Sequence, residues 1–455
     1  MPNVSGLECG KRAGRQSVIG TWLRRVLSVA AFLSLAVPSL ALGQGFNNEG
    51  LPVIPFTVVN NFNTTVPLYV YIKGQVNPED IRKNSPLTPD SRVYVTDLTG
   101  DIAAVPYIPS GYTGMLALNL GTAKTTSMMF PKLNGVRIYF SFVNPTMVCC
   151  NTAVGGAPSE PTGWVTTDPN YNTVFDWAEL AWDNGGNTGL GHTTRLGGNL
   201  TQVDMFGMPM RLSLGGQSTT IGNTPITQKA GFTSNRPTIL SAYLQLGTPW
   251  TTLFLTNSGG PLPRLRVISP YHGIALGLFP PKKLDTYISQ VFTFYTSNTL
   301  MTSATCPQDN ITHTLAGNTI TGGFLVFKDA GVERFRFATP STLTVYQNEI
   351  SAIPAPDNPA TPGLNACLGG AVAAKLGGAF IRTTLLVLPS NNLDTYCMTP
   401  ALFYVNTPAQ KYAQIFHTFG INHLAYSFGY DDSCDQSSYI SVDDPTAMTI
   451  TLGGG

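Results

Sequence analysis

The chain has 455 residues, of which 11% are charged and 43% are hydrophobic, and its formal net charge is +1. This length exceeds the size at which a single hydrophobic core stops growing, so the sequence predicts two domains. No basic patch of the kind that nucleic-acid binding requires is present, and we expect no nucleic-acid partner.

The N-terminal segment has the pattern of a secretory signal. Residues 1–25 carry five basic residues and one acidic residue, and an apolar run follows from Val26 to Leu42. Small residues in Ala41-Leu42-Gly43 then fit a cleavage site. Because the run is shorter than the about 20 residues of a membrane span, we predict a signal peptide over residues 1–43 and a secreted protein, extracellular or periplasmic. The alternative is an uncleaved anchor, and Arg24-Arg25 fits either a twin-arginine signal or an ordinary charged head.

The mature chain that this cleavage leaves would have 412 residues. Five basic residues and one acidic residue go with the signal, so the net charge becomes about −3. We find no later segment long and apolar enough to span a bilayer, and we therefore expect no membrane partner for the mature form. We also expect a monomer.

The cysteines predict disulfides. An even number in an exported chain indicates a disulfide framework, and six cysteines allow 15 connectivities. The adjacent pair Cys149-Cys150 should bond to different partners. No C-x-x-C spacing supports a zinc site, and we expect neither a metal nor a cofactor. The six cysteines beyond the signal are Cys149, Cys150, Cys306, Cys367, Cys397 and Cys434.

Residues 44–218 have the pattern of a β domain. Short β-branched and aromatic runs alternate with turn residues, and helix-length amphipathic patterns are missing. Many short strands with Gly and Pro turns favour a barrel or a sandwich. The predicted strands include residues 56–60, 68–72, 93–95, 136–140 and 210–214.

The pattern changes after residues 216–220, and residues 219–439 read as a mixed α/β domain. Apolar residues at helical spacing predict a helix over Pro281–Tyr295. A second helix is predicted to open at Asn406-Thr407-Pro408, with a cap and a proline in the first turn, and to end at Gly420. Strand-like runs such as Phe324–Phe327 lie between them.

Glu179 is the first residue with the setting of a catalytic acid. It lies in the apolar and aromatic segment Val174–Trp182. In a strand, Phe175, Trp177 and Glu179 share one face. A carboxyl group beside aromatic rings loses solvation, which favours the neutral form that a general acid needs. Asp176 competes for this role but falls on the opposite face, which indicates a structural part.

Asp204 has a contrasting setting. It is a lone carboxylate in the apolar segment Asn199–Gly207. Its polar neighbours Asn199, Thr201 and Gln202 are expected to keep it ionised, as a general base must be.

Two carboxylates in contrasting settings form the arrangement that hydrolyses a glycosidic bond. The alternative is that Glu179 and Asp204 are buried acids satisfied by backbone groups or by arginine. Trp164, Trp177 and Trp182 are candidate platforms for sugar rings, with core packing as the alternative for each.

Other catalytic and metal motifs are missing from the sequence. It contains neither H-E-x-x-H nor G-x-S-x-G, which argues against a zinc protease and an α/β-hydrolase. Asp431-Asp432 with Asp435 lacks the central Gly and terminal Glu of a calcium loop, so we interpret it as a solvated acidic turn.

Two motifs of this chain are Asp176-Trp177-Ala178-Glu179 and the segment from Asn199 to Pro209. Together they resemble glycoside hydrolase family 64, the laminaripentaose-producing β-1,3-glucanases, which are related in fold to thaumatin-like proteins. The resemblance extends to Leu51 through Val70, to Leu284–Val291 and to Tyr426–Asp432, and it covers most of the mature chain.

This resemblance implies a mainly β, thaumatin-like barrel or sandwich domain beside the mixed α/β domain, with a wide groove between them. It also implies that residues 440–455 return to the barrel. The implied reaction is inverting hydrolysis of β-1,3-glucan, with Glu179 as acid and Asp204 as base, and with a five-sugar oligomer as the main product. Thr201 matches a position that contacts sugar.

The stretch between the two carboxylates departs from the family pattern because it is longer. Ala181 and Asp183 stand where the family places sugar contacts. The expected substrate-binding residues are Thr201, Asn199, Gln202, Trp177, Trp182, Asp183 and Trp164. The alternative to an enzyme is a non-catalytic, thaumatin-like protein that binds β-glucan.

Overall fold

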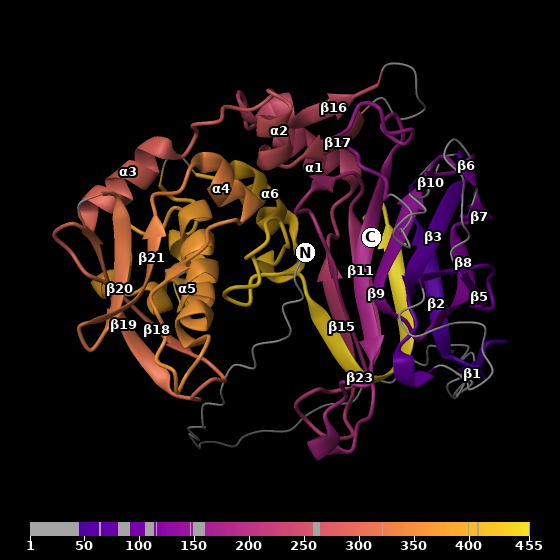
Figure 1. Ribbon diagram of the computed structural model, residues 1–455. Coiled ribbons are helices and arrows are strands. Elements are labelled where there is room, and N and C mark those ends of the chain that lie inside the picture. The colour runs from indigo at the N-terminus through magenta and orange to yellow at the C-terminus, as the bar shows by residue number, and fades with distance from the viewer. Residues whose placement is uncertain are drawn as a thin grey trace, which may run out of the picture. The chain divides into compact units, whose positions relative to one another are not determined.

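Figure 1 shows the computed structural model of the chain, which describes residues 45–62, 65–80, 92–104, 113–114, 116–145, 147–148, 160–257, 264–320, 322–398, 400–406 and 409–454. The predicted signal peptide lies outside the described residues. The described part belongs to one compact unit, Gly43–Gly455.

A 13-stranded, curled sheet is the largest element of the fold. Its strands are β1 (Gly45–Phe46), β2 (Pro52–Asn60), β3 (Leu68–Gln75), β4 (Arg92–Val95), β5 (Ile102–Ala104), β7 (Leu118–Gly121), β8 (Thr125–Pro131), β9 (Asn134–Ser141), β11 (Phe175–Asp183), β12 (Arg195–Leu200), β14 (Met210–Gln217), β15 (Pro225–Gly231) and β23 (Ile440–Leu452). The main path runs β1-β2-β23-β12-β11-β9-β3-β4-β5, and β7, β8, β14 and β15 pair with its members. The fold is therefore mainly β, as predicted.

Alternating burial explains why these segments form strands. Along β14, Met210, Leu212 and Leu214 are at most 1% exposed, while the residues between them are partly exposed. A strand with one buried face gains its stability from that apolar face. The five strands predicted at residues 56–60, 68–72, 93–95, 136–140 and 210–214 are confirmed.

The last strand of the chain lies inside the sheet rather than at its edge. β23 pairs in parallel with β2, and antiparallel with β12 and with β14. Its residues Met448, Ile450 and Leu452 are at most 1% exposed. Residues near the C-terminus thus complete the core on which β11 and β12 lie.

The remaining elements include three small sheets and six α-helices within the described residues. A five-stranded sheet has the order β18-β19-β20-β21-β22, a three-stranded sheet the order β13-β17-β16, and β6 pairs with β10. The bounds are β6 (Thr113–Gly114), β10 (Met147–Val148), β13 (Met205–Phe206), β16 (Phe254–Thr256), β17 (Arg264–Ile268), β18 (Leu300–Thr305), β19 (Thr312–Ile320), β20 (Phe324–Asp329), β21 (Val332–Ala338), β22 (Ile353–Pro354), α1 (Arg236–Leu244), α2 (Pro270–Ala275), α3 (Asp285–Phe294), α4 (Thr342–Gln347), α5 (Leu364–Ile381) and α6 (Lys411–Phe419).

The predicted domain boundary between residues 218 and 219 falls in the connection between β14 and β15, and both strands belong to the large sheet. The division into residues 44–218 with 440–455, and residues 219–439, stays a prediction.

The two predicted helices differ in how well the sequence placed them. The helix predicted over Pro281–Tyr295 is confirmed as α3, although it begins only at Asp285. The second helix, α6, ends before Gly420 as predicted, but its predicted start was wrong. It begins at Lys411, because the side chain of Gln410 caps it by accepting a hydrogen bond from the Ala413 backbone N–H. Thr407 and Pro408 lie outside the described residues.

Helix α5 was not predicted. By length and composition it could cross a membrane, and two-thirds of it is buried inside the protein. The expectation that no later segment is long and apolar enough for this was therefore wrong. The helix is apolar because it packs as a core element against β18 and β21.

Two disulfides join parts of the chain that are distant in sequence. Cys306 bonds to Cys367, and Cys397 bonds to Cys434. They close loops of 61 and 37 residues, and loops of this size stabilise a fold by roughly 3–4 kcal/mol each. Cys149 and Cys150 lie outside the described residues.

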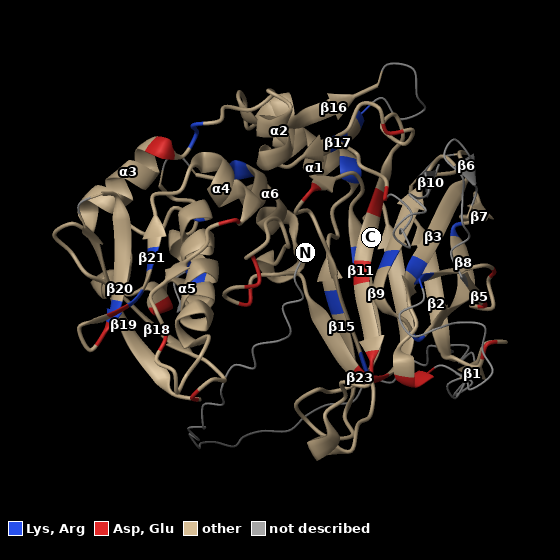
Figure 2. Ribbon diagram, in the orientation of Figure 1, with Lys and Arg blue, Asp and Glu red and all other residues tan. Residues whose placement is uncertain are grey.

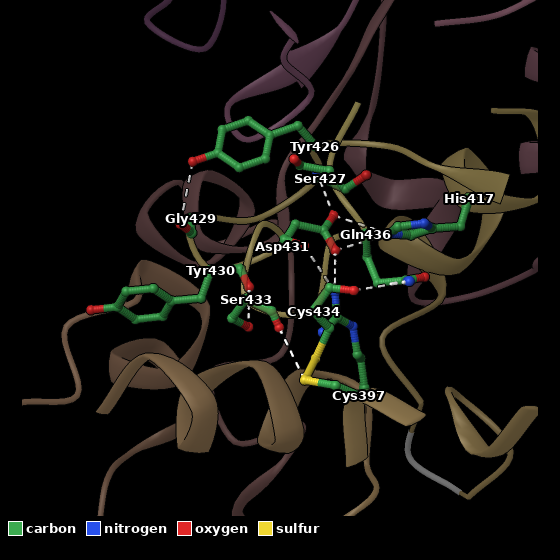
Figure 3. Close-up of polar contacts among 12 residues, drawn as sticks. Cys397, His417, Tyr426, Ser427, Gly429, Tyr430, Asp431, Ser433, Cys434 and Gln436 are labelled. Carbon is green, nitrogen blue, oxygen red and sulfur yellow. Dashed lines mark hydrogen bonds and ion pairs between the residues drawn. A yellow bond between two sulfur atoms is a disulfide. The ribbon is translucent and has the colours of Figure 1, made fainter. Parts of the chain in front are cut away.

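Asp431 is the centre of a buried polar cluster (Figure 3). Its carboxylate accepts hydrogen bonds from Arg382 Nη2 at 2.6 Å, from His417 Nε2 at 3.0 Å and from the Ser427 backbone N–H at 2.8 Å. The side chains of Arg382 and Asp431 are both 0% exposed. The predicted solvated acidic turn was therefore wrong for Asp431, because a buried guanidinium neutralises it.

The substitution Asp431→Asn should lower the free energy of unfolding by about 3 kcal/mol, because it leaves the buried Arg382 without a counter-charge. The measurement is urea unfolding followed by fluorescence. The control is Asp432→Asn, one residue along and exposed, which should change stability by less than about 0.5 kcal/mol. Equal losses in the two variants would contradict this account of the cluster.

Candidate active site

Glu179 lies in the middle of a row of polar side chains that crosses four strands. In β11 it is opposite Arg137 of β9 on one side and Asn199 of β12 on the other. Arg137 is in turn opposite Lys73 of β3. Residues directly opposite each other share a face of a sheet. Figure 2 shows the result, with acidic residues on β11 next to basic residues on β9 and β3.

The carboxylate of Glu179 has a cationic partner as well as an aromatic one. Its Oε1 lies 2.9 Å from Arg137 Nη2, and the same oxygen accepts a hydrogen bond from Trp177 Nε1 at 3.3 Å. The side chain is 29% exposed. The environment of Glu179 therefore contains the predicted aromatic neighbour and also an ion pair with Arg137, which was not predicted.

Glu160 connects this ion pair to a larger charged network. Its carboxylate forms ion pairs with Lys73 and with Arg137, and it accepts a hydrogen bond from Tyr139 Oη at 2.9 Å. Arg137 thus holds Glu160 with Nη1 and Glu179 with Nη2. Shared in this way, the guanidinium is fixed in position beside Glu179.

Asp204 is placed by the small sheet rather than by the large one. It directly precedes β13, which pairs with β17, and its carbonyl oxygen accepts a hydrogen bond from the Ser269 backbone N–H at 2.9 Å. Helix α2 begins at Pro270, one residue later, with proline at its favoured first position. The first turn of α2 therefore brings Tyr271 and His272 to the Asp204 side chain.

Both of these residues donate to one oxygen of Asp204. Tyr271 Oη donates to Oδ1, and His272 Nε2 lies 2.9 Å from the same atom. Oδ2 receives no hydrogen bond from the part of the chain that the structure describes. The Asp204 side chain is 23% exposed. The protein thus orients one carboxylate oxygen through two hydrogen bonds, and the described residues donate none to the other.

Competing effects set the pKa of Asp204. Burial would raise it, but the hydrogen bonds from His272 and Tyr271 and the positive charge of Arg137 outweigh burial and hold the pKa below its usual range. Burial also lowers the pKa of His272, so its imidazole donates as a neutral ring. Asp204 is thus an ionised carboxylate near neutral pH, as predicted, although the groups responsible were not those predicted.

The two carboxylates share one electrostatic neighbourhood. Arg137 contacts Glu179 and also lowers the pKa of Asp204. Burial is the main cause that raises the pKa of the neighbouring Tyr139, and the charges of Glu179 and Asp204 and the nearby Tyr71 raise it further. Arg137 acts in the opposite direction. Arg137 therefore acts electrostatically on both acids, in direct contact with Glu179 and at longer range on Asp204.

A pocket of about 370 Å³ opens beside Glu179, and we call it the Glu179 pocket. Most of its lining belongs to β9, β11 and β12, and four of the lining residues are the small residues Gly135, Ala181, Gly197 and Gly198. Asn199 lines it, and the Asn199 Oδ1 atom has no hydrogen-bond partner among the described residues. The lining residues are Gly135, Val136, Arg137, Glu179, Leu180, Ala181, Gly197, Gly198, Asn199 and Tyr439.

Two of the predicted sugar platforms belong to the core. Trp177 is 2% exposed and Trp182 is 0% exposed, and Trp182 stacks on Phe130. Neither indole presents a face to solvent, so the structure corrects their assignment as platforms. Trp177 acts on the site through its N–H, which donates to Glu179.

Trp164 lies near the other carboxylate. Its ring stacks on the imidazole of His272, with centroids 3.8 Å apart and an interplanar angle of 19°. One face of the indole is therefore already covered. The stack fixes the ring of His272 and, through it, the hydrogen bond to Asp204.

The remaining predicted sugar contacts lie in different surroundings. Thr201 and Gln202 are 4% and 3% exposed, and the Gln202 backbone N–H donates to the Tyr426 carbonyl oxygen at 2.7 Å. Asp183 lies at the end of β11 and accepts a hydrogen bond from the Gly185 backbone N–H at 2.8 Å. None of these three lines the Glu179 pocket.

Asp176 has the structural part that its strand face indicated. Its carboxylate accepts hydrogen bonds from the backbone N–H groups of Trp177, Gly207 and Met208 at 2.8–3.0 Å. Burial raises its pKa to about 7, although these donors and Arg266 act in the other direction. Asp176 thus fastens β11 to the segment that follows Asp204.

No cluster of three or more His, Cys, Asp or Glu side chains that could hold a metal ion occurs within the described ranges. The acidic side chains of the site are a part-exposed carboxylate beside a cation, Glu179 with Arg137, and the carboxylate of Asp204, one oxygen of which accepts no hydrogen bond from the described residues.

Comparison with known proteins identifies relatives of most of the chain. Residues 52–452 match the model of a family described as β-1,3-glucanase. A glucan endo-1,3-β-glucosidase from Cellulosimicrobium cellulans is 25% identical over 445 residues, which is 95% of this chain and 73% of the relative. One from Arthrobacter sp. (strain YCWD3) is 25% identical over 431 residues, which is 94% of this chain and 70% of the relative.

Solved structures give the same fold. A laminaripentaose-producing β-1,3-glucanase in complex with laminaritetraose superposes with a TM-score of 0.68 at 25% identity, covering 88% of this chain and 98% of that one. A β-1,3-glucanase domain from Clostridium beijerinckii gives a TM-score of 0.63 at 24% identity, with the same two coverages. These likenesses confirm the resemblance that the two sequence motifs indicated.

Proposed function

This chain belongs to the β-1,3-glucanase family, glycoside hydrolase family 64, and on that premise we propose that it hydrolyses β-1,3-glucan by an inverting mechanism, with Glu179 as general acid and Asp204 as general base. The observation that carries the proposal is the contrast between the two carboxylates. Asp204 is held ionised by Tyr271 and His272, whereas Glu179 faces an open pocket.

The proposed reaction is a direct displacement. Glu179 protonates the departing glycosidic oxygen, and Asp204 takes a proton from the water that attacks the opposite face of the sugar. In an inverting enzyme the carboxyl groups stand about 6.5–9.5 Å apart to leave room for that water. The Oδ2 atom of Asp204 supports this assignment, because Tyr271 and His272 contact only Oδ1 and Oδ2 accepts no hydrogen bond from the described residues.

We propose short laminari-oligosaccharides, mainly the pentaose, as products. One structural relative is described as laminaripentaose-producing and was crystallised with laminaritetraose. Asn199 lines the pocket and is the predicted substrate contact that fits this position best. Thr201, Gln202 and Asp183 stay predictions that would require the bound glucan to reach beyond the pocket.

The protein is proposed to act outside the cytoplasm as a monomer. The two disulfides support export, because disulfides persist in oxidising compartments. The proposed signal peptide, residues 1–43, would be removed on the way.

The test of the mechanism is the configuration of the first product. Hydrolysis of laminarihexaose in an NMR tube should release the α-anomer first, because inversion converts the β-linkage. The control is the same spectrum after mutarotation. First release of the β-anomer would exclude direct displacement, and failure of the purified protein to release any reducing sugar would refute the proposed function.

The hydrogen bonds to Asp204 predict a shift in pH dependence. Tyr271→Phe removes one donor and keeps the ring, so it should raise the pKa of Asp204. The base is active when ionised, and activity falls as pH falls through that pKa, so the acid limb of kcat/KM should move to higher pH. Loss of a charge-assisted hydrogen bond should also lower kcat about tenfold.

The matched variant is His272→Phe, which keeps a ring against Trp164 and removes the other donor. It should shift the same limb in the same direction. A pH profile with an unmoved acid limb in both variants, at unchanged thermal stability, would contradict the role of these donors.

A further inference from the structure

Tyr439 is an exposed aromatic side chain in the Glu179 pocket, and we propose that it stacks on a glucosyl ring of the substrate. This inference rests on the proposed function, because it assigns a contact to the glucan. Tyr439 is 53% exposed. It is the one aromatic residue among the described residues that line the pocket.

The ring of Tyr439 lies over the backbone of β12 at Gly197. Gly197 is two residues from Asn199, so a side chain on it would point to the same face as Asn199 and Glu179. A Cβ placed on Gly197 would overlap the Tyr439 hydroxyl and would lie 2.7 Å from Cζ. Glycine at this position therefore allows the phenol ring to lie close to the sheet.

This position is one row of residues away from the acid. Gly197 is opposite Ala181 in β11, and Asn199 is opposite Glu179. Two residues along a strand span about 7 Å. Tyr439 therefore lines the pocket together with Gly197, Ala181 and Glu179, at the position where a sugar adjoining the cleaved bond would lie.

Stacking is the interaction that this geometry supports. An aromatic ring offers a flat apolar surface for the C–H face of a sugar, and tyrosine offers it at a low cost in conformational entropy. The tryptophans predicted for this task are unsuited, since Trp177 and Trp182 are at most 2% exposed and Trp164 stacks on His272. Tyr439 is the exposed ring that remains in the pocket.

The test compares Tyr439→Ala with Tyr439→Phe, both assayed on laminarihexaose. Removal of the ring should raise KM about five- to tenfold, whereas Phe keeps the ring and should stay within about twofold of the parent. Binding of laminarihexaose to the same variants in a Glu179→Gln background, measured by calorimetry, separates affinity from turnover. The midpoint of thermal unfolding is measured for both variants, to check that substitution of the exposed Tyr439 does not change the stability of the fold.

A second variant uses the glycine beneath the ring. Gly197→Ala should displace Tyr439 and raise KM as Tyr439→Ala does, and it should add little in a Tyr439→Ala background, because coupled residues are non-additive. If the effects of Gly197→Ala and Tyr439→Ala on KM were additive, the proposed position of the ring over Gly197 would be wrong. An unchanged KM in Tyr439→Ala, or an equal rise of KM in Tyr439→Ala and Tyr439→Phe, would contradict stacking. The proposed function would still stand in that case, provided that the wild-type protein hydrolyses laminarihexaose. No cleavage and no binding by the wild-type protein would instead overturn the function itself.

Discussion

Replacing Glu179 with Gln should lower kcat on laminarin by about 10²–10⁴-fold, the usual contribution of a general acid. The variant keeps the shape of the side chain and its hydrogen bond from Trp177, but it has no proton to give to the leaving oxygen. Reducing-end assays on laminarin measure the loss. A variant that cuts as fast as the parent would end the assignment of Glu179 and favour a protein that only binds glucan.

The leaving group offers a sharper version of this experiment. A dinitrophenyl laminari-oligosaccharide releases a stable anion that needs no protonation, so Glu179→Gln should lose far less activity on it than on laminarin. The matched control is Glu333→Gln. Glu333 is also ion-paired to an arginine, at 2.9 Å, and is 30% exposed, but it lies in the five-stranded sheet. It should keep full activity on both substrates.

Replacing Asp204 with Asn should lower kcat by about 10²–10⁴-fold on laminarin and on the dinitrophenyl substrate alike. The attacking water needs a base whatever the leaving group, so an activated substrate cannot compensate. The two carboxylates are thus distinguished by substrate rather than by the size of the loss. Recovery of Asp204→Asn on the activated substrate would exchange the two proposed roles.

Asp329→Asn is the matched control for Asp204. Asp329 accepts a hydrogen bond from an imidazole, His313 Nδ1 at 2.7 Å, and its side chain is 19% exposed. Although burial opposes it, the bonds from His313 and Arg334 lower the pKa of Asp329, as His272 and Tyr271 do for Asp204. A loss of activity in Asp329→Asn would show that the assay reports stability rather than chemistry.

The large sheet was predictable because its strands carry a local signal. Residues such as Met210, Leu212 and Leu214 alternate with partly exposed neighbours, and this period of two is visible in the sequence. Helix α5 has no such signal. Its glycines and alanines are buried on several sides, so no polar face marks the helical period, and only tertiary packing makes it a helix.

The candidate site was predictable only where its residues lie on one segment. Glu179 and Asp204 stood out as lone carboxylates in apolar runs. Arg137 was hidden in a different strand, and it reaches Glu179 through strand register. Tyr271 and His272 follow Ser269-Pro270, a recognisable helix start, but their partner is 67 and 68 residues away. Pairing of β13 with β17 brings them together, and no local pattern encodes that pairing.

The inner position of β23 has a consequence for how the protein acquires its shape. Synthesis reaches this strand after every other member of the large sheet, yet β2, β12 and β14 all need it as a hydrogen-bonding neighbour. Until it emerges from the ribosome, β2, β12 and β14 each lack a partner along one edge, and such edges promote aggregation. A nascent chain that ends before residue 440 would therefore contain both candidate carboxylates but would lack the complete sheet that positions them.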